Sequence, residues 1–154
     1  MSEAVIVGCC NVIADEAGRY LLVRESKESS RRRYNLPAGK PEVGEPLSTA
    51  AVREAHEETG LTVRVERLVG VWHCPRTSEG FGVVNFVFAS TVEGGKPTPS
   101  DEHPEVAFFT RDEIDGLAHQ RLLRGMHIVQ ALDAYERGDS VADVTTVPAS
   151  PLPE

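Results

Sequence analysis

The chain has 154 residues and a formal net charge of −8 at pH 7, from 24 acidic and 16 basic side chains. This length is enough for one domain with a proper hydrophobic core. The acidic balance argues against sequence-independent binding of a nucleic-acid polymer, which needs a basic surface.

The N-terminal segment predicts a buried strand. Residues 4–14 form a nearly continuous apolar run, typical of a strand covered on both faces. No basic residue precedes this short run, so we expect neither a secretory signal nor a membrane span. Cys9 and Cys10 are neighbours in the run and should point to opposite faces. With Cys74 they are expected to be reduced thiols of a cytoplasmic protein.

A second strand is predicted at Tyr20–Arg24, returning after a turn at residues 15–18. Further along, residues 47–59 contain neither Gly nor Pro and favour a helix. Pro46 is suited to the first helical position, where a missing N–H costs nothing. Gly60 is suited to the left-handed position just past the helix end.

Three acidic side chains, Glu54, Glu57 and Glu58, continue the apolar side of this helix when residues are placed about 100° apart. The polar side is expected to carry Thr49, His56 and Thr59. Glutamates are rarely buried unless paired or bound to metal, and three together repel one another. A hard divalent cation removes that conflict. The alternative is a solvated acidic helix with Arg53 as its partner.

Segment 39–61 resembles the signature of the Nudix (MutT-like) hydrolases, and every signature position is filled: Gly39-x5-Glu45-x7-Arg53-Glu54-Ala55-His56-Glu57-Glu58-Thr59-Gly60-Leu61. That family cleaves diphosphate linkages with the help of Mg²⁺ or Mn²⁺. The resemblance implies metal binding by Glu54, Glu57, Glu58 and the backbone carbonyl of Gly39. It also implies structural support of the signature loop by Glu45, Arg53 and Gly60.

The second half of the chain alternates strands and helices. Strands are predicted over residues 62–72, 83–89 and 105–109, with a loop over 93–99. Thr110 and Glu113 have the spacing of a capping box. A longer helix over 120–137 would place Leu122, Met126, Val129 and Leu132 in the core.

The order of these elements predicts an α/β fold with a mixed β-sheet between helices. The resemblance implies the same architecture, a Nudix-type α/β/α sandwich. We expect a single domain over residues 1–138, followed by an extended or disordered tail over 139–154, which has three prolines and no apolar period.

The reaction implied is attack of water at phosphorus, and its general base is less clear than its metal site. Either a glutamate of the signature helix or an acid of a later loop can serve. We favour Glu102 over Glu105, because Glu102 lies in the loop just before a predicted strand. The catalytic candidates are therefore Glu54, Glu57 and Glu102. A solvent-exposed loop acid is an equally good interpretation of Glu102.

Substrate-binding residues are harder to identify. Trp72 is a candidate for stacking on a base, as are Tyr34 and Phe81, although each is suited equally to ordinary packing. Arg24 and Arg33 are candidates for phosphate binding, against the alternative of a solvated basic loop.

The resemblance implies a small-molecule partner of the nucleoside diphosphate type, and many relatives are homodimers. Candidate substrates are ADP-ribose, nucleoside triphosphates and thiamine-type diphosphates. Pro75 lies fourteen residues past Leu61, close to a proline spacing associated with ADP-ribose hydrolases.

Two other functional classes compete with hydrolysis. A catalytically silent binding module or regulator would typically have lost signature acids, and all are present here. An isomerase with the same fold would need further His and Cys groups, for which His73-Cys74 is the nearest pair.

Overall fold

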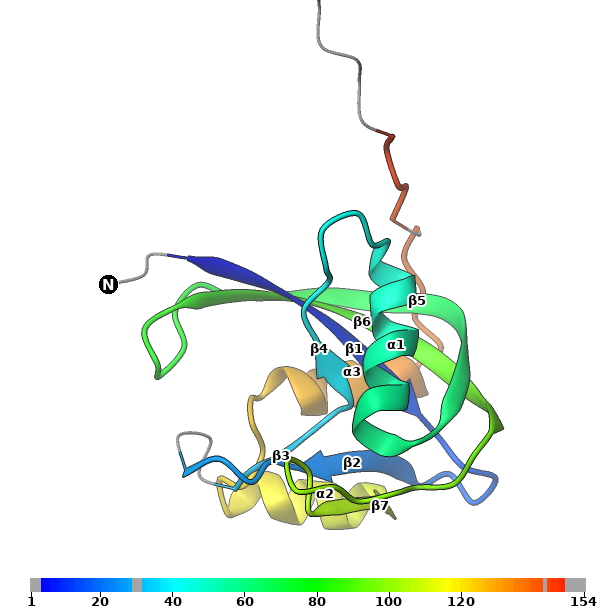
Figure 1. Cartoon of the computed structure of the whole chain (residues 1–154). Coiled ribbons are helices and arrows are strands. Elements are labelled where there is room, and N and C mark those ends of the chain that lie inside the picture. The colour runs from blue at the N-terminus through cyan, green and yellow to red at the C-terminus, as the bar shows by residue number, and fades with distance from the viewer. Residues whose placement is uncertain (1–3, 29–31, 143, 149–154) are drawn as a thin grey trace, which may run out of the picture.

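Two β-sheets and three helices make up the described part of the chain, residues 4–28, 32–142 and 144–148 of a computed structural model (Figure 1). The elements follow the order β1 (Val5–Ile13), β2 (Tyr20–Arg24), β3 (Tyr34–Asn35), β4 (Ala38–Gly39), α1 (Leu47–Thr59), β5 (Thr62–Cys74), β6 (Gly82–Gly94), β7 (Glu105–Phe109), α2 (Arg111–His119) and α3 (His127–Glu136). The predicted strands and the signature helix are present, and β6 continues into the segment expected to be a loop.

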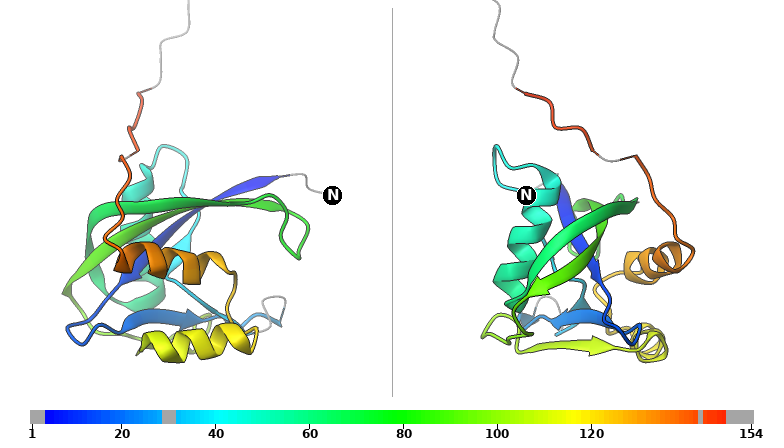
Figure 2. Two further views of the ribbon diagram at one scale, coloured as in Figure 1. Left: turned by 180° about the vertical axis from the view of Figure 1, so that it is seen from behind. Right: turned by 90° about the vertical axis from the view of Figure 1, so that its right-hand side faces the viewer.

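The larger sheet has the order β4-β1-β6-β5, with β1 and β6 parallel and the other pairs antiparallel. Helix α1 covers one face and α3 covers the other (Figure 2). Cys9 packs with Ala51 on the α1 side, whereas Cys10 packs with Leu132 on the α3 side. The predicted alternation of the two cysteines is confirmed, and so is the sandwich with a mixed sheet between helices.

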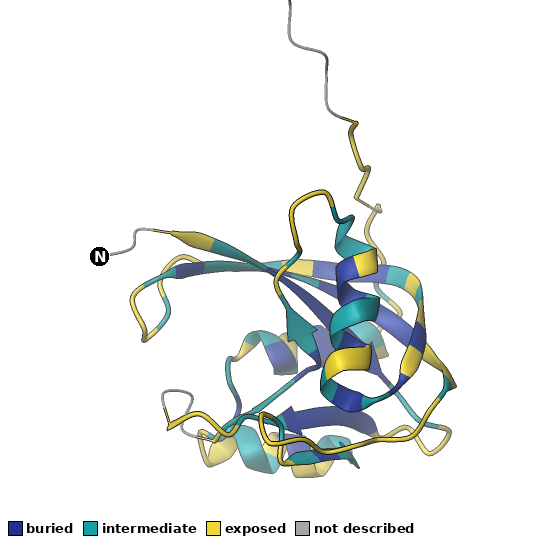
Figure 3. Cartoon of the chain, in the orientation of Figure 1, coloured by how far each residue is buried: buried dark blue, intermediate teal, exposed yellow. Residues whose placement is uncertain are grey.

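A second, antiparallel sheet has the order β3-β2-β7, where the sequence suggested one sheet only. Leu21 and Val23 of β2 pack towards the C-terminal part of α1, and Leu22 packs with Ile114 of α2. Strand β2 is therefore buried on both faces (Figure 3). The short β3 and β4 lie on different sheets, so the segment between them carries the chain from one sheet to the other.

The ends of α1 differ slightly from the prediction. Pro46 is the N-cap, with an extended ψ of 148°, and is not the first helical residue. Gly60 has the expected left-handed conformation, with φ of +77°. Thr59 is fully buried, so its assignment to the polar side was wrong. A later segment covers this helix end, because the Thr98 N–H donates to the Thr59 carbonyl at 2.8 Å.

The predicted C-terminal helix is shorter at its start. The capping box at Thr110 opens α2 as expected, but residues 120–126 form a connection before α3. Arg121 has a left-handed φ of 59°, and the Leu122 carbonyl accepts from the Tyr34 N–H at 2.7 Å. Met126 is 60 % exposed and precedes the helix, so its assignment to the core was wrong. The buried face of α3 consists of Ile128, Ala131, Leu132 and Ala134.

The tail begins by running along the larger sheet. The Val141 N–H donates to the Leu68 carbonyl of β5 at 3.0 Å, and residues 144–148 have no regular secondary structure. The domain boundary at residue 138 stays a prediction. None of the helices in the described ranges is long and apolar enough to cross a membrane.

Candidate active site

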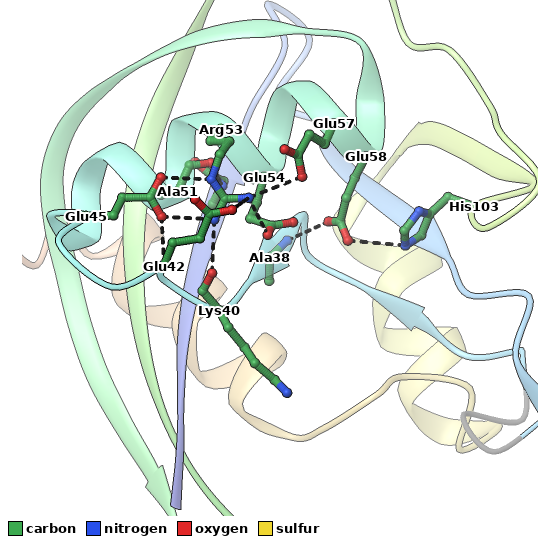
Figure 4. A network of polar contacts seen from close by, with 11 residues as sticks. Ala38, Lys40, Glu42, Glu45, Ala51, Arg53, Glu54, Glu57, Glu58 and His103 are labelled. Atoms are coloured by element: carbon green, nitrogen blue, oxygen red, sulfur yellow. Dashed lines mark hydrogen bonds and ion pairs between the residues drawn. The ribbon is translucent and has the colours of Figure 1, made fainter.

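The loop through β4 and one face of α1 bring the signature residues together (Figure 4). Gly39 lies so close to Glu54 that a Cβ at this position would overlap the Glu54 carboxylate. The neighbouring Ala38 N–H donates to Oε1 of Glu58 at 2.8 Å. The backbone of β4 is thus held against two of the three helix acids, and only glycine fits at the point of closest approach.

Arg53 joins the loop to the helix. Its guanidinium makes two hydrogen bonds to Glu45, at 2.8 and 2.9 Å, and a third to the Lys40 carbonyl at 3.0 Å. Its Nη1 also donates to Glu54 at 2.9 Å and to Glu57 at 3.2 Å. The contact with Arg53 lowers the pKa of Glu45 to about 2. This fork geometry is available to arginine and not to lysine.

The three helix acids have different environments. The side chains of Glu54 and Glu58 are 17 % and 15 % exposed, whereas that of Glu57 is 55 % exposed. Burial raises the pKa of both Glu54 and Glu58 above the ordinary value, and hydrogen bonds from Arg53 and His103 respectively act against that rise. Carboxylates in such positions gain free energy from a nearby cation.

His103 was not assigned a role from the sequence, yet it contacts this cluster. Its Nε2 lies 3.2 Å from Oε2 of Glu58, and that contact raises the pKa of His103. The loop that carries it is held by Ser100, whose Oγ accepts from the His103 N–H and whose N–H donates to the His103 carbonyl. The contact spans 45 positions of the chain, so neither spacing nor periodicity could have indicated it.

The donor set suits a hard divalent cation. Carboxylate oxygens of Glu54, Glu57 and Glu58 and the carbonyl of Gly39 are the ligand type that Mg²⁺ prefers. Within the described ranges, no three Asp, Glu, His or Cys side chains already converge as a complete ligand cage. Mg²⁺ does not require one, because it usually keeps several waters and takes substrate phosphate oxygens. The close approach of Gly39 in β4 to the Glu54 carboxylate is consistent with an Mg²⁺ ion bound by both.

The other predicted site residues lie beside this cluster or apart from it. Glu102 is exposed, and its carbonyl accepts from the Ser26 N–H. Glu105, the other candidate base, accepts from the Tyr34 hydroxyl at 2.6 Å and lies 3.5 Å from Arg24. Arg24 lines a small cavity of about 230 Å³ with Arg32 and Asp101.

Arg33 is partly buried, and its Nε has no hydrogen-bond partner in the described part of the molecule. The Tyr34 ring packs edge-on against Phe109 at 5.3 Å, which favours packing over a stacking role for this tyrosine.

A larger cavity, of about 510 Å³, lies on the α3 side of the sheet. Trp72 and Phe81 contribute aromatic walls, and Asn35, Asn85 and His127 contribute polar ones.

The Trp72 indole lies over Gly70, where a side chain would collide with it. Burial lowers the pKa of His127 to about 4, so its imidazole is neutral at pH 7. The wall is suited to an uncharged ring with hydrogen-bonding edges.

Glu25 connects this cavity to the acidic cluster. It lines the cavity, and its carboxylate accepts from Arg124 at 3.2 Å and from Asn35 at 3.4 Å. The next residue, Ser26, donates its N–H to the carbonyl of Glu102, which directly precedes His103, and the charge of Glu25 adds to the rise in the pKa of Glu58 and of His103. Arg124 bonds Glu79 as well, at 2.9 Å, which ties the β5–β6 hairpin to the segment before α3.

Comparison with known proteins agrees with this geometry. Residues 4–128 match the family model described as the NUDIX domain. The chain is 32 % identical to an ADP-ribose pyrophosphatase from Methanocaldococcus jannaschii, over 73 % of this chain and 68 % of that protein. It is 32 % identical to a MutT-like protein from Streptomyces ambofaciens, over 84 % and 77 %. A NUDIX hydrolase structure from Nitrosomonas europaea superposes with a TM-score of 0.79 at 31 % identity, covering 89 % of this chain and 92 % of that one.

Proposed function

Because this chain belongs to the Nudix family and is a pyrophosphohydrolase, we propose that it hydrolyses a diphosphate linkage in a small nucleotide, in an Mg²⁺-dependent reaction. The observation that carries this proposal is the contact between the β4 backbone and the carboxylates of α1. Gly39 approaches Glu54 closely, and Ala38 holds Glu58. The family generally uses divalent metal ions, and Mg²⁺ is the one that best suits these oxygen donors.

The metal would be held by Glu54, Glu57, Glu58 and the carbonyl of Gly39. When bound, it supplies charge neutralisation of the diphosphate oxygens and a lower pKa for the attacking water. Arg53 keeps Glu54 and Glu57 on the side of α1 that faces the loop, through its bonds to both. His103 and the Ala38 N–H fix the two oxygens of Glu58. These contacts position the acids before substrate arrives.

Glu102 is the general base that we propose. It directly precedes His103, whose imidazole contacts Glu58 at 3.2 Å, which supports a position of its carboxylate near the Glu58–His103 pair. In the reaction, the water oxygen forms a bond to phosphorus, the bridging P–O bond breaks, and the water proton passes to Glu102. A Glu102→Gln variant should lose the general base, seen as a lower kcat with a changed acidic arm of the pH–rate profile. An unchanged profile would assign the proton to another group.

For the organic part of the substrate we propose the cavity lined by Trp72 and Phe81. Glu25 lines this cavity, and the next residue, Ser26, bonds the Glu102 carbonyl beside His103, so a nucleoside bound there would have its phosphates towards the acids of α1. ADP-ribose is the first candidate, since one relative is named as an ADP-ribose pyrophosphatase. Another is named as an 8-oxo-dGDP phosphatase, at 37 % identity over 54 % of this chain, so an oxidised nucleotide belongs in the same test.

The experiment is a substrate panel with and without Mg²⁺, with products identified by mass. The panel holds ADP-ribose, nucleoside and deoxynucleoside triphosphates, 8-oxo-dGDP, nucleotide sugars and thiamine diphosphate. Metal-dependent release of AMP and ribose 5-phosphate from ADP-ribose is the expected result. Turnover of thiamine diphosphate alone would overturn the nucleotide assignment, and absence of turnover with metal bound would favour the binding module.

A further inference from the structure

Asn11 is a polar residue in the middle of β1 and is completely buried. It lies two positions after Cys9, so its side chain is on the sheet face covered by α1. Nothing in the reaction proposed above uses it. A buried amide is costly unless its donors and acceptor are all engaged, so its partners decide what it does.

The Asn11 side chain joins three separate segments. Its Nδ2 donates to the Pro37 carbonyl at 3.2 Å and to the Ala51 carbonyl at 2.9 Å. Its Oδ1 accepts from the Ser90 hydroxyl at 2.9 Å. The Asn11 backbone N–H also donates to the Pro37 carbonyl, at 2.9 Å. A donor that serves two carbonyls fixes the separation between them.

Those two carbonyls belong to the two halves of the candidate metal site. Pro37 precedes Gly39 by two residues, and Ala51 precedes Glu54 by three, less than one helical turn. The contacts of Arg53 and Glu58 join the same segments at the exposed side of the cluster. Asn11 joins them from beneath, inside the core, where solvent cannot compete for the bonds.

We propose that Asn11 is a positioning residue for the metal site, which sets the distance between the Gly39 carbonyl and the carboxylates of α1. The inference rests on the proposed function, because it assumes that these groups bind the metal together. Residues that orient ligands without touching the metal typically contribute tenfold to 100-fold in metal affinity, so an effect of about that size is expected.

The test compares two variants, Ser90→Ala and the double variant Asn11→Leu with Ser90→Ala. Leucine has the same branching as asparagine and no polar atoms, and neither carbonyl is left without a partner by it. Pro37 keeps the backbone bond from residue 11, and Ala51 keeps its helical bond. Removing the Ser90 hydroxyl in both proteins prevents an unpaired buried group from obscuring the comparison. The readouts are the Kd for Mn²⁺ by calorimetry without substrate, the Mg²⁺ activation constant, and stability in urea.

We expect about tenfold to 100-fold weaker Mn²⁺ binding in the double variant, with Ser90→Ala within about twofold of wild type. Wild-type affinity in a folded double variant would overturn the proposal and leave Asn11 as a core hydrogen-bond donor. Equal weakening by Ser90→Ala alone would overturn it too. If the double variant does not fold, Asn11→Ser is tested in its place, because a serine hydroxyl cannot reach both carbonyls. Wild-type Mn²⁺ affinity in Asn11→Ser would likewise overturn the proposal.

The wild-type titration separates this inference from the proposed function. Wild type that binds no Mn²⁺ and hydrolyses no substrate of the panel would remove the proposed function itself. Wild type that binds metal and turns over substrate, with an unaffected double variant, would remove only the role of Asn11.

Discussion

The two sides of the larger sheet differ in how completely their polar groups are satisfied. On the α1 side, Arg53 alone bonds four residues, and both oxygens of Glu58 have partners. On the α3 side, Asn35 Oδ1 and Thr77 Oγ1, at the wall of the cavity, have no hydrogen-bond partner among the residues described. The acids are arranged by the protein itself, whereas the cavity leaves polar groups for a ligand to engage. We therefore propose that the acids on the α1 side carry the chemistry, and that the neighbouring cavity on the α3 side recognises the organic part of the substrate.

The largest effect is expected at Glu57. Its side chain is mostly exposed, so Glu57→Gln should leave the fold intact while removing a metal-binding charge. Turnover should fall by about two orders of magnitude or more. Steady-state rates over a range of Mg²⁺ concentrations test this, with His56→Gln, an exposed neighbour on the same helix, as the control. Full activity of Glu57→Gln with normal metal dependence would remove Glu57 from the metal site.

A smaller loss is expected from Arg53→Lys, which tests whether the α1 side is arranged in advance. Lysine keeps the charge but cannot bond Glu45 through two nitrogens while also reaching Glu54. We expect kcat/KM to fall about tenfold to 100-fold, with a higher Mg²⁺ requirement, as for other groups that orient metal ligands. If Arg53→Lys keeps the wild-type Mg²⁺ requirement, a positive charge at this position is sufficient to arrange the acids of α1, and the fork geometry of arginine is not needed.

The cavity side should respond in binding. A Trp72→Ala variant is expected to raise KM for the preferred nucleotide about tenfold with little change in kcat, because one stacking contact with the base is lost. Val71→Ala is the matched control, since Val71 is 45 % exposed and points to the other side of β5. A fall in kcat at constant KM would instead place Trp72 in the chemistry and undo the separation of the two faces.

The contrast between the faces also explains what the sequence could predict. The signature helix and the direction of its acids follow from spacing within 13 residues, because helical geometry alone fixes them. The cavity depends on Glu25 and Arg124, which are 99 positions apart, and no local pattern connects them. The contacts of His103 and Asn11 were missed for the same reason, since each joins segments that are far apart in the chain.

The errors near the helix ends have a related cause. A helical wheel places Thr59 by angle alone, but the segment around Thr98 covers that end of α1 and buries it. The predicted helix over 120–137 was extended too far because its apolar spacing continues through residues 120–126. Those residues instead pair with Tyr34, and α3 begins only at His127. Tertiary contacts override periodicity at such positions.

The smallest effect expected is a pH-dependent change in stability at His103. Glu58 raises the pKa of His103 in the folded protein, so the pair stabilises the fold fully below the unfolded pKa of about 6.5. That contribution is lost as pH rises through the higher folded pKa. The urea midpoint of metal-free wild type should therefore exceed that of His103→Gln most at pH 6, and the difference should shrink towards pH 9.

Repeating His103→Gln in a Glu58→Gln background tests whether Glu58 causes this pH dependence of the urea midpoint. Glu58 is the main cause of the raised pKa of His103, and only the weaker effects of Glu25 and Glu102 remain without its carboxylate, so the difference between the two proteins should depend on pH much less. A wild-type advantage that grows with pH would contradict the pairing. It would mean that the neutral imidazole is the stabilised form, and that the acids of α1 depend on the bonds from Arg53 and Ala38 without support from His103.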